Sequence, residues 1–405
     1  MATLLGIGAS AQVQTSDGQA QTEIRTAEEL AALSDSETSL SGDYVLINDL
    51  TLDNWTPIGI GDSDGQGFCG TLDGNGHTVT IAGFGDSPDN TRVGLFGTIA
   101  EGGVVKNLRV AGDVDYTGSQ TILYIGGIAG INYGWVACCA SVIELKAGIK
   151  NTTTHRLKGI TWYEDGTFGG GIAGINFGTI TNSYSTGSVS LKGDRTMNYA
   201  GGIAGGNGHG IKGSFGIGVG SGGVSVSVTP GTAAIGHVIE NCYSTAEVFS
   251  EADMVIVGSG LMKSATIVKS GGIAAHNHPT GAIIGSVSLC KTIQASAKGQ
   301  SGISTAMPTA SIGIGNYRHS LVFFGRDIVI REYKNGQERK PRKFSNKEAV
   351  SLSVTQEESW WRYPDGLTEK QRAQTFGFAF GDDEQSPWAW DDETKRPVLY
   401  WEKYI

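Results

Sequence analysis

Short apolar runs of three to five residues, each bounded by glycine or asparagine, recur along most of this 405-residue chain. The runs are rich in β-branched residues, which favour strands. Glycine and asparagine tolerate the left-handed backbone that a sharp bend requires, so they mark turns between the runs. No helical pattern of ten or more residues separates the runs, which excludes alternating β-α-β units. The pattern predicts an all-β protein built from short strands.

A six-residue pattern, Gly-Ile-Ala-Gly-x-Asn, returns along the chain with few changes. Its copies begin at Gly127, Gly171, Gly202 and Gly272, and a weaker copy without the asparagine begins at Gly94. The intervals between successive copies are 33, 44, 31 and 70 residues, so the period is irregular. A second unit follows the first, because residues 180–186 match residues 239–245. Self-similarity of this kind is typical of repeat architectures.

Strands this short do not make a stable flat sheet alone. Stacked at about 4.8 Å, each strand would pair with the strands above and below it and bury a column of Ile and Ala. The repeat therefore predicts a right-handed parallel β-helix, a solenoid, with short capping helices at both ends. A β-sandwich is the alternative, but it does not explain why the same short sequences return in register.

Stacking the repeats aligns one asparagine from each copy, five residues after the first glycine. Identical stacked amides can hydrogen-bond along the axis. We therefore expect a structural ladder of four side chains: Asn132, Asn176, Asn207 and Asn277. Extra residues at about 143–168, 208–236 and 250–270 account for the uneven period and are expected on the flank. The segment 208–236 is nearly free of charge and either is mobile or adds local strands.

The two ends differ from the middle. Thr26-x-x-Glu29 is a capping box that predicts a short helix over residues 27–33, and Thr368-x-x-Gln371 predicts another. Residues 317–405 hold 30 of the 70 charged side chains and five of the eight tryptophans. We expect three regions: a remnant of an export signal and leader at 1–25, the repeats with their helical cap at 26–316, and C-terminal coils with an aromatic-rich cap at 317–405. The leader is inferred from an apolar stretch followed by an A-x-A pattern at residues 9–11.

The C-terminal aromatic residues admit two interpretations. Indoles could cover the last coil, whose core and strand edges would otherwise be open, and Trp401 is then expected to be buried. Trp388 and Trp390 share the i, i+2 spacing of one strand face and lie beside a run of acids. These two residues could instead form a platform on which a glycan stacks.

Composition excludes several classes of protein. The chain contains 62 glycines, and a glycine content this high could indicate disorder. However, 39% of the residues are hydrophobic, which is enough to bury a core and excludes a disordered chain. A formal charge of −10 argues against a nucleic-acid partner. The one dense basic run, residues 339–343, is most simply a solvated loop. No apolar run approaches the ~18 residues of a membrane span.

The complete motif at residues 170–187, G-G-I-A-G-x-N-x-G-x-I-x-N-[SC]-Y-S-T-G, resembles the GLUG repeat of bacterial surface proteins. Residues 55–59 and 70–77 resemble the opening coil of such proteins, and residues 397–402 resemble their closing segment. The resemblance covers about residues 26 to 405. It implies a bacterial, exported protein similar to adhesins. No peptidase residue can be transferred from related IgA-protease-type proteins, because no H-E-x-x-H occurs here.

Candidate chemistry is sparse. Gly208-His209-Gly210 resembles a motif of polygalacturonases, but no Asp-Asp pair precedes it, and glycoside hydrolysis needs two placed carboxylates. His276 and His278 could bind a metal from one strand face, although a polar turn with exposed histidines is the simpler interpretation. Residues 62–65 look like half a calcium loop without its glutamate. We assign no catalytic, cofactor-binding or metal-binding residue and expect no cofactor.

The five cysteines are expected to be free thiols. Cys139 and Cys242 occupy the same repeat column with Ser183 between them, so about 9–10 Å separates them, beyond the reach of a disulfide. Adjacent Cys138 and Cys139 should point to opposite faces of a strand. These are small core residues rather than a disulfide framework.

Taken together, the sequence predicts an exported, non-catalytic scaffold, secreted or held at the cell surface, that is monomeric and binds a glycan or a protein. The alternative is a carbohydrate-active lyase or hydrolase with its site on a β-helix flank. Carboxylates gathered with Arg or Lys in one groove would favour the enzyme. An uncharged flank with scattered aromatic residues would favour binding.

Overall fold

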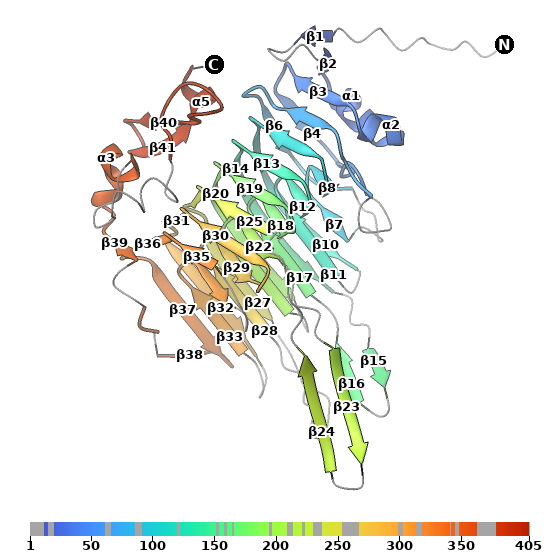
Figure 1. Ribbon diagram of the computed structural model, residues 1–405, viewed down its shortest axis with the longest axis vertical. Coiled ribbons are helices and arrows are strands. Elements are labelled where there is room, and N and C mark those ends of the chain that lie inside the picture. The colour runs from blue at the N-terminus through green and yellow to red at the C-terminus, as the bar shows by residue number, and fades with distance from the viewer. Residues whose placement is uncertain are drawn as a thin grey trace, which may run out of the picture.

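The protein is described here from a computed structural model, shown in Figure 1. It describes residues 12–14, 20–60, 66–85, 91–119, 122–150, 154–157, 160–163, 166–193, 197–208, 214–220, 223–229, 237–252, 267–298, 303–312, 318–340, 342–344, 348–362 and 378–404. Strands dominate these residues, helices are short, and most strand pairs are parallel. The prediction of an all-β protein is therefore confirmed.

Four parallel sheets account for most of the strands. Sheet 1 runs in the order β1 (Gln12–Gln14), β2 (Ala20–Ile24), β3 (Asp43–Leu46), β5 (Thr71–Asp73), β9 (Val104–Lys106), β13 (Trp135–Ala137), β19 (Thr179–Thr181), β25 (His237–Glu240), β30 (Gly281–Ile284) and β35 (Arg318–Ser320). Its first pair, β1 and β2, is antiparallel, and the other pairs are parallel.

Sheet 2 carries the longest strands. Its order is β4 (Leu50–Leu52), β6 (Thr78–Ile81), β10 (Arg109–Gly118), β14 (Ala140–Ile149), β20 (Tyr184–Gly193), β27 (Glu247–Ala252), β32 (Thr292–Ala297), β37 (Val329–Lys334) and β38 (Gln337–Glu338). A side branch from β20 adds β26 (Tyr243–Ser244), β31 (Val287–Ser288), β36 (Phe323–Gly325) and β39 (Ala349–Val350). The last pair, β37 and β38, is antiparallel.

Sheets 3 and 4 contain the repeated glycine pattern. Sheet 3 consists of β7 (Arg92–Val93), β11 (Ile122–Gly126), β17 (Gly166–Gly170), β21 (Met197–Gly201), β28 (Ile267–Gly271) and β33 (Ile303–Met307). Sheet 4 consists of β8 (Phe96–Ile99), β12 (Ala129–Asn132), β18 (Ala173–Asn176), β22 (Ala204–Asn207), β29 (Ala274–Asn277) and β34 (Ala310–Ile312). From β7 onward the chain visits sheets 3, 4, 1 and 2 in that order, and then returns to sheet 3.

Two of the expected extra segments contain their own antiparallel hairpins. β15 (Thr154–Leu157) pairs with β16 (Ile160–Tyr163), and β23 (Ser214–Gly220) pairs with β24 (Gly223–Thr229). The segment 208–236 thus adds local strands, one of the two outcomes expected for it. Most of the third segment, residues 253–266, lies outside the described residues.

The N-terminal helix forms where the capping box predicted it. α1 (Ala27–Ala31) continues into the 3-10 turn η1 (Ala32–Ser34) and is followed by α2 (Glu37–Leu40). The Thr26 hydroxyl accepts the N–H of Glu29 at 3.2 Å, and Leu30 and Leu33 are buried. Glu29 itself accepts the N–H of Arg25 rather than that of Thr26, so the reciprocal half of the box is displaced by one residue. The helix expected from Thr368 lies outside the described residues.

The repeated glycines allow parts of the chain to approach closely. A β-carbon at Gly127 would lie 2.7 Å from the hydroxyl of Ser141, and Gly171 faces Ser185 in the same way one repeat later. A β-carbon at Gly205 would lie 2.6 Å from the main-chain nitrogen of Gly169, because the backbones of sheets 4 and 3 meet there. The motif therefore has glycine where another strand leaves no room for a side chain. The Ile that follows the first glycine of each copy is fully buried: Ile128, Ile172, Ile203 and Ile273.

The corner between sheets 1 and 2 needs a left-handed residue in each turn. Asn107, Asn182 and Asn241 follow sheet 1 strands directly and have φ between 46° and 52°. Asparagine adopts this conformation more readily than most residues. Cys138 (φ 53°) and Leu321 (φ 52°) occupy the same corner in other turns. This requirement explains the Asn before [SC]-Y in the repeat.

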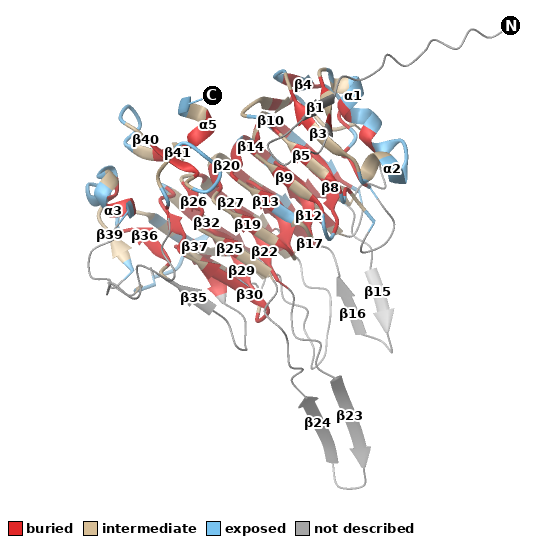
Figure 2. Cartoon of the chain, turned by 45° about the horizontal axis from the view of Figure 1, so that its top comes forward, coloured by how far each residue is buried: buried red, intermediate tan, exposed pale blue. Residues whose placement is uncertain are grey.

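The C-terminal segment folds back along the side of the sheets, and Figure 1 shows it next to β20, β31 and β36. It contains η2 (Val354–Gln356), α3 (Glu358–Arg362), the hairpin of β40 (Trp388–Asp391) and β41 (Arg396–Leu399), and α5 (Tyr400–Tyr404). Its aromatic residues form a second core against Tyr184, Tyr243 and Phe323, which belong to three different levels of sheet 2. The expectation that they cover the last coil is wrong: they cover the side. Figure 2 shows buried residues along the strands and exposed ones mainly at the helices and turns.

Candidate functional site

The proposed platform of Trp388 and Trp390 is not available to a sugar. Trp388 is fully buried, with its ring 4.8 Å from that of Phe378 and 5.8 Å from that of Tyr243. Trp390 is half-buried and packs against the edge of the same cluster. The glycan-platform interpretation of this pair is therefore wrong, because burying indole area stabilises the C-terminal segment instead.

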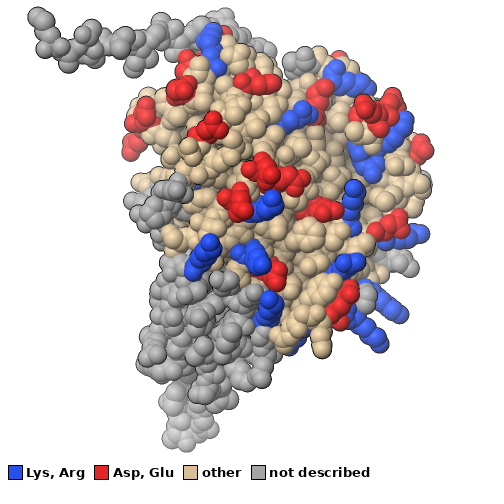
Figure 3. All heavy atoms as spheres, turned by 180° about the vertical axis from the view of Figure 1, so that it is seen from behind, with Lys and Arg blue, Asp and Glu red and all other residues tan. Residues whose placement is uncertain are grey.

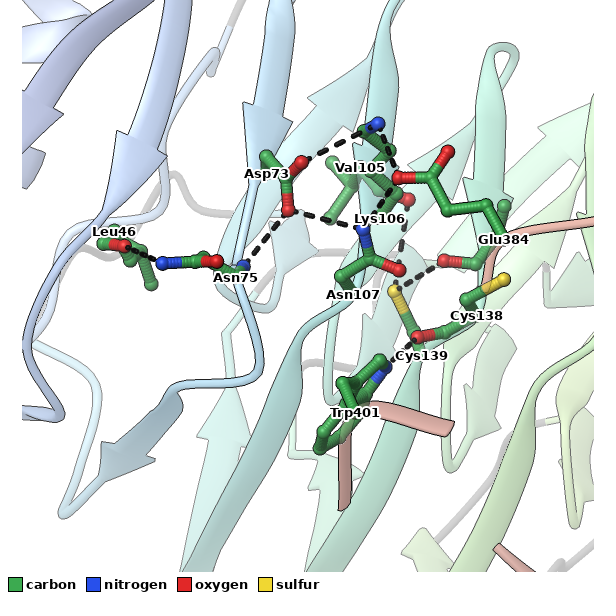
Figure 4. A network of polar contacts seen from close by, with 11 residues as sticks. Leu46, Asp73, Asn75, Val105, Lys106, Asn107, Cys138, Cys139, Glu384 and Trp401 are labelled. Carbon is green, nitrogen blue, oxygen red and sulfur yellow. Dashed lines mark hydrogen bonds and ion pairs between the residues drawn. The ribbon is translucent and has the colours of Figure 1, made fainter. Parts of the chain in front are cut away.

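Polar contacts fix the C-terminal segment to sheet 1 and sheet 2. Figure 4 shows Lys106, next to Asp73, donating a 2.6 Å hydrogen bond to Glu384 of the C-terminal segment. Asn107 donates to the same carboxylate at 2.9 Å. Further along, the buried carboxylate of Glu402 accepts the Tyr184 hydroxyl at 2.7 Å and pairs with Arg109. These contacts attach the C-terminal segment to the two sheets.

The four asparagines of the expected ladder lie in one column in sheet 4. Three hydrogen bonds of 2.8 Å, each from an amide nitrogen to the next amide oxygen, join them in the order Asn132, Asn176, Asn207, Asn277. All four side chains are fully buried. The amide oxygen of Asn132 ends the column without a partner, because Ile99 takes this place in the preceding strand. The ladder is structural, since no amide faces solvent.

His276 and His278 come together, but not as exposed turn residues. Their ring centres are 4.3 Å apart, His278 is half-buried, and His276 is only 8% exposed. The expectation of solvent-exposed histidines is therefore wrong for His276. Among the described residues, no group of three or more His, Cys, Asp or Glu side chains is placed to hold a metal ion. His209 and the acidic residues Asp62 and Asp64 lie outside that part of the chain.

The outer face of sheet 1 carries an exposed tryptophan that the sequence analysis missed. Trp135 opens β13 and is 53% exposed. Across the sheet its nearest row neighbours are uncharged, namely Thr71, Val104, Thr179, Val238 and Ala282, and the row then reaches Asp43 on one side and Arg318 on the other. Beside this row the rings of Tyr133 and Phe177 stack 5.2 Å apart. The sequence signal that could have identified it is the alternation within β13, in which Trp135 and Ala137 point outward and Val136 between them is buried.

A second surface lies between the outer face of sheet 2 and the C-terminal segment. It is a groove of about 660 Å³ with charged and hydroxyl side chains along its floor. Glu144 and Glu247 stand in one row with Ser188 between them, and Ser188 donates to Glu144. Lys146 and Arg396 line the same groove. Figure 3 shows acidic and basic side chains mixed, not segregated by sign, over the face seen from behind.

The two surfaces match the two expectations from the sequence. The middle of the sheet 1 row is uncharged and bears an exposed aromatic residue, the features expected of a binding face. The sheet 2 groove combines carboxylates with Lys and Arg, as a carbohydrate-active site would. Neither surface could be located from the sequence, because strand register and the folded-back segment decide which side chains meet. No helix in the described residues is long and apolar enough to cross a membrane.

Comparison with known proteins adds one partial similarity. Over 81 residues the chain is 37% identical to a protein of Evansella cellulosilytica provisionally described as a Gly-rich membrane protein. The aligned residues make up 20% of this chain and only 9% of that protein. No protein-family model matches the chain, and no solved structure matches it.

Proposed function

We propose that this chain is an exported, non-catalytic scaffold that binds a glycan through the outer face of sheet 1. The observation that carries the proposal is Trp135, which is 53% exposed and has uncharged residues at the nearest positions of its row, Val104 and Thr179. Exposing an indole forgoes the stabilisation that its burial would bring, so a ligand that covers it is a physical reason for its position. The scaffold acts as a monomer, secreted or held at the cell surface.

The chemistry of the face fits a neutral sugar. A pyranose presents C–H groups on one face, which stack on an indole, and hydroxyls around its rim. Thr71 and Thr179 place hydroxyl groups in the same row as Trp135, so they can exchange hydrogen bonds with that rim. Asp73, Lys106 and Glu240 carry charges at the other end of three of these strands, and Asp43 and Arg318 hold the row positions next to Thr71 and Ala282. A protein partner on this face is the alternative that the binding experiment separates.

We also propose that the fold is a right-handed parallel β-helix of the GLUG type. Three observations support it: the parallel order within each sheet, the fixed order in which the chain visits the four sheets, and the alignment of equivalent repeat residues across strands, such as Ala129, Ala173 and Ala204. Crossovers between parallel strands are right-handed in nearly all proteins. An experimental structure determines the handedness, and a left-handed winding would overturn this proposal.

The binding proposal is tested with a glycan array on the purified chain, followed by titration calorimetry of the hits. Trp135→Ala should weaken binding at least about tenfold, which corresponds to about 1.4 kcal/mol, without changing thermal stability. Val142→Ala is the matched control, because Val142 is 39% exposed on sheet 2. Hits that bind equally well to both variants and to the wild-type chain would remove the sheet 1 face as the binding site. Binding to proteins alone would replace the glycan by a protein partner.

A second candidate is a carbohydrate-active enzyme at the sheet 2 groove. Two strand spacings separate Glu144 from Glu247, about 9–10 Å, near the spacing of inverting glycoside hydrolases. Lys146, Lys291 and Arg396 could hold an acidic sugar in the same groove. Each hit is incubated with the chain and analysed for released reducing ends and for unsaturated products. Cleavage that is lost in Glu247→Gln but kept in Trp135→Ala would favour this candidate over the scaffold.

A further inference from the structure

Lys269 on β28 contacts an imidazole rather than a carboxylate. Its Nζ lies 3.0 Å from Nδ1 of His276 and 4.9 Å from the ring centre of Tyr199. The side chain is half-buried, and burial lowers the pKa of its amine. The ion pairs of lysine found among the described residues involve Lys106, Lys146, Lys298 and Lys395, and none involves Lys269. A cation held out of water without a counter-charge is disfavoured, so the site favours the neutral amine.

The contacts of His276 are compatible with a neutral amine at Lys269. Its Nδ1 also lies 3.0 Å from the main-chain carbonyl oxygen of Ser311. A carbonyl oxygen only accepts, so this contact is a hydrogen bond in the tautomer that carries its hydrogen on Nδ1; the Ser311 hydroxyl also lies 3.4 Å from that nitrogen. An ammonium at Lys269 would then direct its own hydrogens at that N–H. A neutral amine instead offers a lone pair, and both 3.0 Å contacts are satisfied together.

Two of the groups around the amine, Tyr199 and His276, are uncharged at neutral pH. Burial raises the pKa of the Tyr199 phenol to about 12. Burial, with the nearby charge of Lys269, lowers the pKa of His276 to about 4. Burial lowers the pKa of Lys269 itself to about 8. His278 also faces this cluster, with its ring 4.3 Å from that of His276. Near pH 8 a large fraction of Lys269 is therefore unprotonated.

We propose that Lys269 is a covalent carbonyl-binding site, at which its amine condenses with an aldehyde such as the open-chain form of a reducing sugar. The nitrogen lone pair forms a bond to the carbonyl carbon, and the carbonyl π electrons move to oxygen. A proton passes from nitrogen to that oxygen to give a carbinolamine, which loses water and leaves an imine. One water is released, and nothing is oxidised or reduced. The proposal does not depend on glycan binding at Trp135.

His276 is a positioning residue in this reaction. Its N–H lies between the Ser311 carbonyl and the amine, so it can keep its bond to Ser311 when the Lys269 lone pair turns to the carbonyl carbon. It also fills the space beside the amine that water would otherwise occupy, since it is only 8% exposed. Buried lysines with neutral amines are the form in which lysine acts as a nucleophile.

The test measures the reactivity of each lysine in the wild-type chain. The folded protein is treated briefly with glycolaldehyde and sodium cyanoborohydride at pH 8, digested with a protease that does not cut at lysine, and analysed by mass spectrometry. At pH 8 a pKa of about 8 gives a neutral fraction about 100-fold above that of an ordinary lysine. We expect Lys269 to be labelled at least about tenfold faster than Lys146, whose side chain is 57% exposed. Equal or slower labelling of Lys269 would overturn the proposal.

Two further measurements distinguish a reactive site from simple exposure. The labelling rate of Lys269 should reach half its maximum near pH 8, whereas that of Lys146 should still rise above pH 10. His276→Ala should move the midpoint of Lys269 upward, because water then reaches the amine and stabilises its charge. A Lys269 midpoint at 10 or above in the wild-type chain would also overturn the proposal, and this measurement requires no variant to fold.

Discussion

The indole nitrogen of Trp401 donates a 3.0 Å hydrogen bond to the main-chain carbonyl of Cys138, although 263 residues separate the two. Cys138 occupies the left-handed corner between sheets 1 and 2. Trp401 is 4% exposed, and its ring also lies 5.7 Å from the guanidinium of Arg109. This contact anchors the end of the chain to an early turn, so the C-terminal segment joins distant levels of the sheets.

Trp401→Ala should lower the free energy of unfolding by about 3–5 kcal/mol, the usual cost of truncating a buried tryptophan. Thermal unfolding followed by near-ultraviolet circular dichroism measures the change. Trp390→Ala is the matched control, and a smaller loss is expected because Trp390 is only half-buried. Equal losses in the two variants would contradict the anchoring role of Trp401.

Replacing an internal rung of the asparagine ladder should cost more than replacing its first rung. Asn176→Leu breaks amide bonds to both neighbours and should cost about 1–3 kcal/mol. Asn132→Leu should cost less, because its amide oxygen has no partner and Asn176 keeps a second donor in the N–H of Gly178. Urea unfolding of both variants measures the difference. The reverse order would be inconsistent with the ladder.

Asn182 tests the left-handed corner. At φ 46°, alanine is strained by its β-carbon, so Asn182→Ala should cost about 1–2 kcal/mol. Asn182→Gly has no β-carbon and should lie within about 0.5 kcal/mol of the wild-type chain. The two unfolding free energies are compared in the same denaturant series. A glycine variant as unstable as the alanine variant would show that the side chain, not the backbone, matters here.

The cysteines should differ sharply in reactivity. Burial raises the pKa of Cys138 and Cys242 to about 12 and that of Cys290 to about 11, and it raises that of Cys139 further. Because the thiolate is the reactive form, these four thiols should stay unmodified by iodoacetamide at pH 8 in the folded chain. Cys69 is exposed and should react. We expect one modified cysteine before unfolding and five after it; fewer than five without reductant would indicate a disulfide.

Acid should weaken the attachment of the C-terminal segment at Glu384. Burial alone would raise the pKa of this carboxyl, but hydrogen bonds from Lys106 and Asn107 and the charge of Lys106 outweigh it, and the pKa is lowered. The contact therefore stabilises the fold above the unfolded pKa of about 4.3 and is lost as pH falls through the lower folded pKa. The carboxylate is 43% exposed, so the effect should stay below about 1 kcal/mol.

Glu384→Gln tests this contact. The stability difference between the wild-type chain and the variant should be largest near pH 7 and should shrink between about pH 5 and 3, as the wild-type carboxylate takes up a proton. Unfolding free energies at several pH values measure it. If the difference in unfolding free energy between the two proteins does not change with pH, the charge of Glu384 contributes nothing to stability.

The sequence by itself determined the strands, their turns and the positions that stack. Period-2 alternation and boundary glycines act locally, so Val136 or Ile180 can be assigned to a core without knowledge of the rest of the chain. The spacing of Asn176 from its glycine likewise placed it in a column with its equivalents. The position of the cysteines in the repeat likewise predicted that they are free thiols, and all five are free in the structure.

Only the tertiary structure decided what the outer faces became. Whether Trp388 or Trp135 is exposed depends on where the C-terminal segment folds back, and no local pattern encodes that path. The contact of Lys269 with His276 likewise requires sheets 3 and 4 to meet closely, which the glycines between them permit. Strand formation is a property of short stretches, whereas the exposure of a side chain depends on every segment that packs against it.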